Sequence, residues 1–280
     1  MGDVVRVAIP NKGRLSAPTL DLLRRAGLVF EASERALSVP VRNAALEILF
    51  VRADDIPELV HDGVAAFGIT GRDLVVEAGF TDGVLLDLGY GRCRLVLAVP
   101  ERSEISDVAD LDGLRVATSH VRTVERFFAD EGVEVTVVPL RGSVEVAPRL
   151  DVADAVVDLV STGSTLMVNG LRPVVTLLDS EAVLIADGDD PDVPLATMLQ
   201  SVVVGRRKRY VLMNAPADSI DAIEEIIPGA DAPTVVPLAH DSMVAIHSVV
   251  DADELWSVLP RLEAAGASAI LVLPVEQMIR

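Results

Sequence analysis

Short apolar segments alternate with longer amphipathic segments along most of the chain, and this alternation restricts the fold more than any other feature. The segment VVRVAIP (residues 4–10) is predicted to be a strand. Residues 11–27 are predicted to be a loop and a helix, with Ser16 as its N-cap and Gly27 as its terminator. The same pattern of a strand and then a helix recurs at AAFGIT before GRDLVVEAG, at LRVATS before VRTVERFFADEG and at EVTVVPL before GSVEVAPRL. Repeated crossovers of this kind predict an α/β fold with mostly parallel sheets.

The length and composition indicate a globular protein of about two domains. The chain has 280 residues, of which 50% are hydrophobic, and Cys93 is its only cysteine. An internal disulfide and a multi-cysteine zinc site are therefore excluded. The apolar stretches are far shorter than the roughly 20 residues of a membrane span. Asp3, Arg6 and Lys12 interrupt the region where a signal peptide needs a continuous apolar centre, so we expect a cytoplasmic protein.

The net charge limits the class of ligand. A formal charge of -19 at pH 7 disfavours binding to nucleic acids and to anionic membranes, which depends on widely distributed lysines and arginines. An anionic ligand must therefore be held locally, by a few arginines, a lysine and backbone N–H groups.

The last third of the chain is predicted to be a separate module. Residues 186–194, ADGDDPDVP, indicate a surface loop, and the apolar spacing of residues 196–204 indicates a helix after it. The basic run 206–209, RRKR, either caps that helix or is a solvated face beside an acidic body. Beyond it the elements follow the order βαββαβ, which predicts a ferredoxin-like module. Pro260 falls inside its second helix, where it is expected to cost about 3 kcal/mol or to kink the helix, unless the helix breaks there.

The stretch DAVVDLVSTGSTL (residues 154–166) carries two acids in an apolar run and then hydroxyls and a glycine. Asp154 and Asp158 lie on one face of the predicted strand but about 13 Å apart, so they cannot both hold one small group. We expect the strand to end near Asp158, at the carboxyl edge of the sheet, where ligands bind in α/β folds. The turn that follows offers a cradle for a phosphate. An ordinary N-capped turn beside a solvated acid explains the same residues.

An acid followed by Thr-Gly-x-Thr resembles the phosphoribosyl pyrophosphate loop. In that loop the turn binds the 5-phosphate and the acid holds ribose hydroxyls. The resemblance assigns phosphoribosyl pyrophosphate binding to Asp158 and to the turn residues Ser161, Thr162, Gly163, Ser164 and Thr165. The common loop has two adjacent acids, whereas this sequence has Val157 at the position of the first, which leaves Asp154 as the second acid.

Seven segments in order resemble ATP phosphoribosyltransferase, the first enzyme of histidine biosynthesis, over essentially the full length. They are VAIPNKGRL, RADDIPELV, FGITGRDLV, GRCRLVLAVP, ADAVVDLVSTGSTLMVNGLRPV, APTVVPL and GASAILVLPVEQM. The likeness is to the long form, which carries its own C-terminal regulatory domain. It implies transfer of the phosphoribosyl group of phosphoribosyl pyrophosphate to N1 of ATP, with release of pyrophosphate and help from Mg²⁺.

The resemblance also implies an architecture. Two catalytic lobes similar to periplasmic binding proteins would comprise residues 1–92 with 181–206 (lobe I) and residues 93–180 (lobe II). Residues 207–280 would form the histidine-binding regulatory domain, with Thr234, Ser268 and Ala269 in its pocket, although these three positions also suit core strands. Histidine and AMP would be inhibitors, and a compact hexamer and a looser active dimer would be the two states.

The chemistry needs cations where negative charge develops on the leaving pyrophosphate. Lys12, Arg14, Arg52 and Arg72 fall at strand-to-helix loops and are assigned to ATP and pyrophosphate binding. Lys12 and Arg52, with Asp158, are the predicted catalytic residues. Each cation could instead be an exposed loop residue.

Three further residues join this predicted site. Gly71 and Asp73 of ITGRD, and Glu145, are assigned to ATP and pyrophosphate binding, although Asp73 could be a simple N-cap and Glu145 an exposed first-turn residue. No strong general base is needed, because the adenine nitrogen is already a nucleophile. His61, His120, His240 and His247 lack metal-ligand spacing and are predicted to be structural or on the surface. Mg²⁺ is expected to arrive with pyrophosphate rather than in a dedicated protein cage.

Two other functions share parts of this pattern. A bilobed solute-binding or effector domain would need no catalysis, and Asp158 with its turn would then have no necessary role. Prephenate dehydratase also joins a bilobed catalytic unit to a small regulatory module, but it would not need a phosphate cradle.

Overall fold

The computed structural model describes residues 4–32, 36–162, 164–188, 194–229, 232–239 and 242–279. The chain divides into two compact units. Residues 1–196, except 25–27, form the first, and residues 197–280 together with 25–27 form the second. No helix among the described residues is long and apolar enough to span a membrane.

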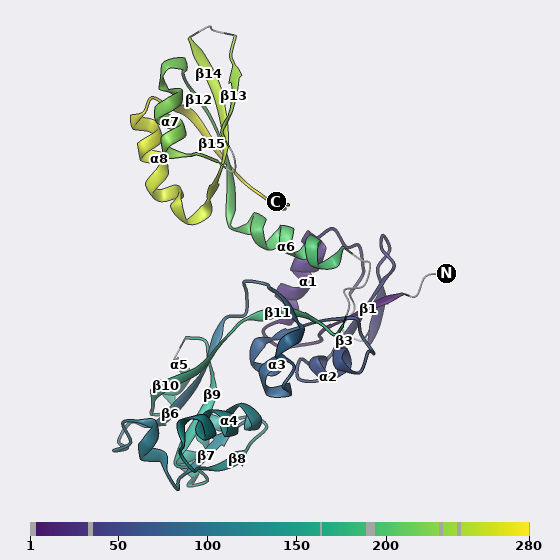
Figure 1. Ribbon diagram of the computed structural model, residues 1–280, viewed down its shortest axis with the longest axis vertical. Helices are drawn as coiled ribbons and strands as arrows, with labels where there is room; N and C mark the ends of the chain where they lie inside the picture. The colour runs from purple at the N-terminus through teal and green to yellow at the C-terminus, as the bar shows by residue number, and fades with distance from the viewer. Residues whose placement is uncertain are drawn as a thin grey trace. The chain divides into compact units, whose positions relative to one another are not determined.

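Lobe I of the first unit is built on a six-stranded sheet in the order β2-β3-β1-β4-β11-β5 (Figure 1). Its central strands β1, β3 and β4 run parallel, whereas β11 is antiparallel to β4 and β5. Buried side chains of α2 pack with those of β1 and β11 in the core. The elements are β1 (Val5–Pro10), α1 (Ser16–Arg25), β2 (Ser38–Pro40), β3 (Leu46–Val51), α2 (Ile56–His61), β4 (Phe67–Gly71), α3 (Arg72–Ala78), β5 (Val84–Asp87) and β11 (Ala182–Ala186).

Lobe II is built on a five-stranded sheet in the order β10-β6-β9-β7-β8. Strand β7 runs parallel to β8 and β9, and β6 is antiparallel to β9 and β10. Val124 and Phe128 of α4 are buried against this sheet in the core. The elements are β6 (Cys93–Pro100), β7 (Arg115–Thr118), α4 (Val121–Glu131), β8 (Thr136–Pro139), β9 (Ala155–Val160), α5 (Ser164–Val168) and β10 (Leu171–Ser180).

The chain passes from lobe I to lobe II between β5 and β6 and returns between β10 and β11. The predicted two-lobed α/β architecture is therefore confirmed. Parallel pairing is less general than predicted, because the strands at the two crossings, β6, β10 and β11, run against their neighbours. The helix expected after β8 is replaced by two short 3-10 turns, Val144–Val146 and Pro148–Leu150.

The second unit contains the predicted ferredoxin-like module. Its four-stranded sheet has the order β13-β14-β12-β15, and α7 and α8 lie on one face of it (Figure 1). Ile223 of α7 and Leu262 of α8 are fully buried against Val211, Met213 and Ile246 of the sheet. The elements are α6 (Leu195–Arg206), β12 (Lys208–Pro216), α7 (Ile220–Ile226), β13 (Thr234–Pro237), β14 (Met243–Asp251), α8 (Leu255–Ala264) and β15 (Ser268–Pro274).

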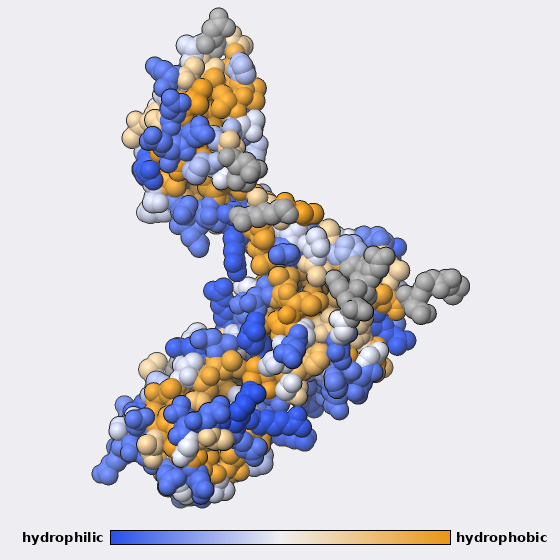
Figure 2. Space-filling model, viewed as in Figure 1, coloured by the Kyte–Doolittle hydropathy of each residue, from blue (hydrophilic) through white to orange (hydrophobic). Residues whose placement is uncertain are grey.

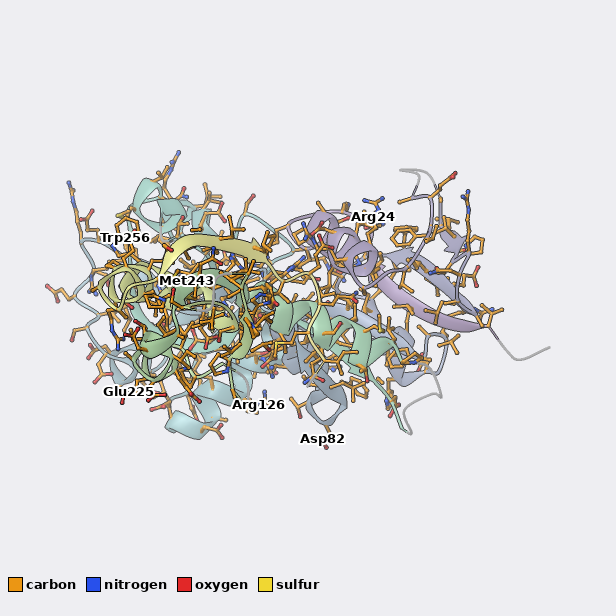
Figure 3. All side chains as sticks on the ribbon, turned by 90° about the horizontal axis from the view of Figure 1, so that it is seen from above. Arg24, Asp82, Arg126, Glu225, Met243 and Trp256 are labelled. Carbon is orange, nitrogen blue, oxygen red and sulfur yellow. The ribbon has the colours of Figure 1, made fainter. Side chains whose placement is uncertain are left out.

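Details of this unit refine the sequence predictions. The helix predicted over residues 196–204 is α6, whose last residue is Arg206, and Lys208 already begins β12. Helix α8 continues through Pro260 instead of breaking there. Its Trp256 projects outward and is 93% exposed (Figure 3).

The edge strands β13 and β15 carry exposed apolar side chains (Figure 2), namely Val235, Val236, Leu271, Val272 and Leu273. Residues 189–193 of the predicted acidic loop lie outside the described residues.

Candidate active site

Asp158 lies near the carboxyl end of β9, as expected from the sequence. Its Oδ1 accepts a hydrogen bond from the backbone N–H of Leu159 at 2.8 Å. The pKa of the Asp158 carboxyl is raised, because burial disfavours the charged form and the charge of Glu145 adds to that effect. Asp158 therefore lies near the carboxyl end of a strand parallel to β7, the part of an α/β sheet where ligand-binding residues occur.

The predicted phosphate turn follows directly. Ser161 and Thr162 are exposed. Gly163 lies outside the described residues, as do the side chains of Ser164 and Thr165, whose backbone begins α5. The described part of the turn, Ser161 and Thr162, therefore lies at the same sheet edge as Asp158.

A pocket of about 630 Å³ is lined by both lobes, and Leu159, next to Asp158, is part of its wall. Lobe I contributes five of the predicted site residues to it: Lys12, Arg14, Arg52, Gly71 and Asp73. Lobe II contributes Ser119, His120, Leu140, Arg141, Gly142 and Leu159. Loops at the carboxyl ends of β1, β3 and β4 face the loops that follow β7 and β8 and the end of β9, so the topology itself creates this pocket.

Two cations of this pocket, Arg52 and Arg14, are held by hydrogen bonds. Arg52 makes two hydrogen bonds to the carboxylate of Asp54, at 3.0 and 2.7 Å, and this pairing raises the pKa of Arg52 and lowers that of Asp54. Arg14 donates to the carbonyl of Gly91 at 3.1 Å and to Sγ of Cys93 at 2.9 Å. Because Gly91 and Cys93 lie where the chain crosses between lobes, Arg14 connects the pocket to the crossing segment.

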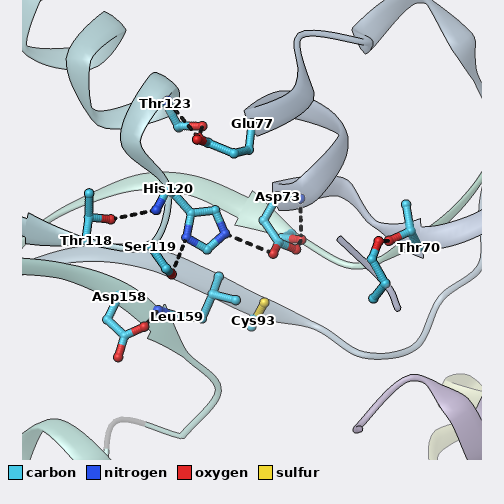
Figure 4. Close-up of polar contacts among 12 residues, drawn as sticks. Thr70, Asp73, Glu77, Cys93, Thr118, Ser119, His120, Thr123, Asp158 and Leu159 are labelled. Carbon is cyan, nitrogen blue, oxygen red and sulfur yellow. Dashed lines mark hydrogen bonds and ion pairs between the residues drawn. The ribbon is translucent and has the colours of Figure 1, made fainter. Parts of the chain in front are cut away.

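Asp73 is the centre of a buried network between the lobes (Figure 4). The side chain is 2% exposed, its Oδ1 accepts from the Ser180 hydroxyl at 2.5 Å, and its Oδ2 lies 3.3 Å from Nε2 of His120. Burial alone would raise the pKa of Asp73, but the hydrogen bonds with His120 and Ser180 and the charges of His120 and Arg14 outweigh it, so the pKa is lowered. The carboxylate that was predicted to bind ATP or pyrophosphate is thus already engaged within the protein.

Gly71 supports this network through its lack of a side chain. A Cβ atom at this position would lie 2.4 Å from Oδ1 of Asp73. Any larger residue would push the carboxylate away from Ser180.

Arg72 lies in a different pocket, of about 510 Å³, which also contains Ser161 of the predicted turn. Its guanidinium pairs with Asp87. Arg92, Arg94 and Cys93 lie in the same wall. Asp158 itself lines neither pocket; the next residue, Leu159, lines the first, and Ser161, three residues after Asp158, lines the second.

The structure does not bring Asp154 or Glu145 into the first pocket. Asp154 precedes β9, at the end of the sheet opposite to Asp158, and its carboxylate accepts from the backbone N–H and the guanidinium of Arg115 at 2.9 to 3.1 Å. This pairing lowers the pKa of Asp154. Glu145 lines a third pocket of about 300 Å³ with Arg102 and Arg149.

The predicted regulatory residues lie at opposite edges of the second unit's sheet. Thr234 is the first residue of β13, and Ser268 and Ala269 begin β15. All three are exposed. Ala269 adopts a positive φ of 51°, which is uncommon for a residue other than glycine. One chain alone does not bring Thr234 together with Ser268 and Ala269.

Several residues of the first pocket were not predicted as site residues. His120 follows β7, and Arg141 follows β8, so both occupy the loop positions where ligand-binding residues occur. That positional signal was available from the sequence. Ser180 and its bond to Asp73 were not predictable, because the two residues are 107 positions apart. His240 lies outside the described residues, within which no group of three or more His, Cys, Asp or Glu side chains is placed to hold a metal ion.

Comparison with known proteins shows similarity over the whole chain. A family model described as ATP phosphoribosyltransferase matches residues 52–202, and one described as HisG, C-terminal domain, matches residues 205–277. Proteins named ATP phosphoribosyltransferase from Methanococcoides burtonii and Natronomonas pharaonis are 43% and 47% identical to the chain. The matches cover 99% and 98% of the chain and 100% of each relative.

A solved structure is also similar to this chain. It is titled ATP phosphoribosyl transferase (HisG:HisZ) complex from Thermotoga maritima, and it is similar to the chain with a TM-score of 0.62 and 26% identity. The similarity covers 71% of this chain and 98% of that one.

Proposed function

The chain belongs to the ATP phosphoribosyltransferase family, and from this premise we propose that its substrates meet at the carboxyl end of β9, between the two lobes. The enzyme transfers the phosphoribosyl group of phosphoribosyl pyrophosphate to N1 of ATP and releases pyrophosphate. This is the first step of histidine biosynthesis. The observation that carries the proposed location is that Leu159 and Ser161, which flank the end of β9, line two pockets that each contain several Lys or Arg side chains together with carboxylates.

We assign the phosphoribosyl group to Asp158 and the turn of residues 161–165. A carboxylate at the end of a strand can accept hydrogen bonds from the ribose hydroxyls and so orient C1 of the ribose for attack. Hydroxyl and backbone N–H groups of the turn would bind the 5-phosphate. The exposure of Ser161 and Thr162 leaves this side of the turn open to a ligand.

Lys12, Arg14 and Arg52 are assigned to the pyrophosphate and to the phosphates of ATP. Displacement at C1 develops positive charge on the ribose and negative charge on the leaving pyrophosphate, so fixed cations beside the leaving group lower the barrier. Lys12 and Arg52 line the first pocket. Arg72 and Ser161 share the second, where Arg72 would contact the phosphoribosyl side of the substrate. Asp73 would act by holding Arg14, which lies 3.9 Å from it.

Mg²⁺ fits this donor set as an ion carried by the substrate. Mg²⁺ is bound in proteins through one or two carboxylates together with phosphate oxygens and water. Asp54 and Asp55 line the first pocket and are the carboxylates that would complete its shell. When bound, the ion would neutralise charge on the pyrophosphate.

We propose that two of the three sheets form the catalytic lobes and that the third belongs to the regulatory domain. Residues 1–92 with 181–206 and residues 93–180 would form the two catalytic lobes, and residues 207–280 the regulatory domain. We propose histidine as an inhibitor bound near Thr234, Ser268 and Ala269, and AMP as a second inhibitor. The exposed apolar edges β13 and β15 suit contacts between copies of the chain, so we propose a homo-oligomer that interconverts between dimer and hexamer.

The test is an assay of product formation with the full-length protein. The purified protein is mixed with ATP, Mg²⁺ and phosphoribosyl pyrophosphate, and the absorbance of phosphoribosyl-ATP is followed, with each substrate omitted in turn. We expect product only in the complete mixture, and less product when histidine is added. Absence of product with substrates shown to be intact would contradict the proposal.

A further inference from the structure

The C-terminal end of α3 in lobe I meets the N-terminal end of α4 in lobe II, and each helix end supplies hydrogen-bond partners to the other. Glu77 accepts from the backbone N–H groups of Arg122 and Thr123, both at 2.9 Å, and from the hydroxyl of Thr123 at 2.7 Å. In return Arg122 donates to the carbonyl of Ala78 at 3.4 Å. Figure 4 shows Glu77 reaching Thr123 across the boundary between the lobes.

Helix α4 lacks a cap of its own. Its N-cap residue, His120, makes no side-chain capping bond, and its first turn contains no acidic residue. The first N–H groups of a helix need acceptors, and a carboxylate is especially favourable there because of the helix dipole. Here that carboxylate comes from a residue 45 positions earlier, in the other lobe. Capping of α4 therefore depends on the two lobes staying together.

A second carboxylate of α3 reinforces the contact. Asp73 lies four positions before Glu77, on the same side of the helix, and contacts His120. Asp73 and His120 are 2% and 4% exposed, and Thr123 is 7% exposed. Asp73, Ser119 and His120 also line the first pocket, so the contact is part of the wall of the substrate site.

We infer that Glu77 is a positioning residue for the transferase reaction. With Asp73, His120 and Thr123 it forms an interlobe clasp that fixes the spacing between Lys12 and Arg52 on one side of the pocket and Arg141 and Leu159 on the other. This inference rests on the proposed function of that pocket. Without the clasp the lobes sample other spacings, and only a fraction of molecules is competent to bind both substrates. The apparent dissociation constant rises as the inverse of that fraction.

The kinetic test is Glu77→Gln in the full-length protein. The variant keeps the size of the side chain but replaces an acceptor oxygen with an amide group that faces N–H donors. We expect the KM values for both ATP and phosphoribosyl pyrophosphate to rise about tenfold, while kcat stays within about twofold. A purely structural role would lower kcat in proportion to the folded fraction and leave both KM values unchanged, and that result would overturn the inference.

Two further variants make the assignment specific. Glu125→Gln changes an exposed glutamate of α4, the helix that Glu77 caps, and should leave both KM values unchanged. Thr123→Val removes the hydroxyl that donates to Glu77, and its effect on KM should be largely lost in the Glu77→Gln background, because the two residues act as one contact. Fully additive effects would contradict a shared clasp.

A distance measurement tests the clasp without any assay of activity. Cys93 is buried, so cysteines introduced at the exposed positions Asp82 in lobe I and Arg126 in lobe II are the sites that a spin label modifies. We expect Glu77→Gln to broaden the distribution of distances between the two labels relative to the otherwise unchanged protein. An unchanged distribution would overturn the clasp. A broadened distribution in a protein that forms no phosphoribosyl-ATP would contradict the proposed function and its catalytic consequence, but not the clasp itself.

Discussion

At the scale of single residues, Asp158 has a proposed binding function and lies where burial disfavours its charged form. Its carboxyl is partly removed from water at the end of β9, and its pKa is raised chiefly by that burial. Asp154, four residues earlier, has the opposite environment: its pKa is lowered by hydrogen bonds from Arg115. Residues that bind ligands often reduce stability, whereas residues that serve the fold increase it. We therefore predict different effects for substitutions of the two aspartates.

We expect Asp158→Asn to lower kcat/KM for phosphoribosyl pyrophosphate by about 100-fold, because the ribose loses its orienting acceptor.

The melting temperature of this variant should not fall. A raised pKa means that the folded protein binds a proton at Asp158 more readily than the unfolded chain does. The contribution of Asp158 to stability is therefore complete below the ordinary pKa near 4 and is lost as the pH rises through the raised value. The melting temperature of Asp158→Asn should exceed that of the unchanged protein by more at pH 7 than at pH 4. A lower melting temperature at pH 7 would show that the charge stabilises the fold.

We expect Asp154→Ala to act on the fold. Its pair with Arg115 is partly exposed, at 33% and 43%, and the backbone N–H of Arg115 also loses its acceptor. The free energy of unfolding should fall by about 1 kcal/mol in a denaturant titration. The KM for phosphoribosyl pyrophosphate should stay within about twofold. A large rise in that KM would instead support Asp154 as the second acid of the phosphoribosyl pyrophosphate loop.

At the scale of secondary-structure elements, the sequence patterns predicted most helices and strands but not how their ends interact. The strand before Asp158, the turn after it and the βαββαβ order follow from apolar periodicity and turn residues, which are local. Capping of α4 by Glu77 and the bond between Ser180 and Asp73 join residues far apart in sequence. No local pattern contains that information. The 3-10 turns after β8 also departed from the predicted helix, in a segment where Ser143 adopts a positive φ of 51°.

Helix α8 gives a prediction at this scale. Pro260 lies inside the helix, where it has no N–H to donate to a carbonyl of the preceding turn. We expect Pro260→Ala to raise the free energy of unfolding of the second unit by about 1 to 3 kcal/mol, measured by chemical denaturation. Pro260→Gly serves as the control, because it restores the N–H without the helix propensity of alanine. If Pro260→Ala destabilised the unit, the ring of Pro260 would have to contribute packing that outweighs the missing bond.

At the scale of the whole molecule, the chain contains two α/β lobes and a separate sheet whose edge strands, β13 and β15, are exposed. Thr234 lies on one edge strand and Ser268 on the other, so a regulatory pocket containing both needs more than one copy of the chain. A sequence can suggest these residues by resemblance, but their separation across the sheet appears only in the fold. Inhibition and assembly should therefore be linked.

We expect histidine to shift the protein toward a larger assembly, measured by light scattering, over the same concentration range in which it inhibits product formation. Thr234→Ala should raise the histidine concentration for half-maximal inhibition about tenfold, which corresponds to about 1.4 kcal/mol of lost binding. The assembly curve should move with it. Inhibition that persisted with no change in molecular mass would separate the two processes.

The most direct test of the central claim is a crystal structure of the protein with phosphoribosyl pyrophosphate and Mg²⁺. We expect the 5-phosphate to lie on the turn of residues 161–165, the ribose hydroxyls to lie within hydrogen-bond distance of Asp158, and the pyrophosphate to point toward Lys12 and Arg52. A sugar phosphate bound elsewhere, with that turn empty and Asp158 facing solvent, would contradict the account.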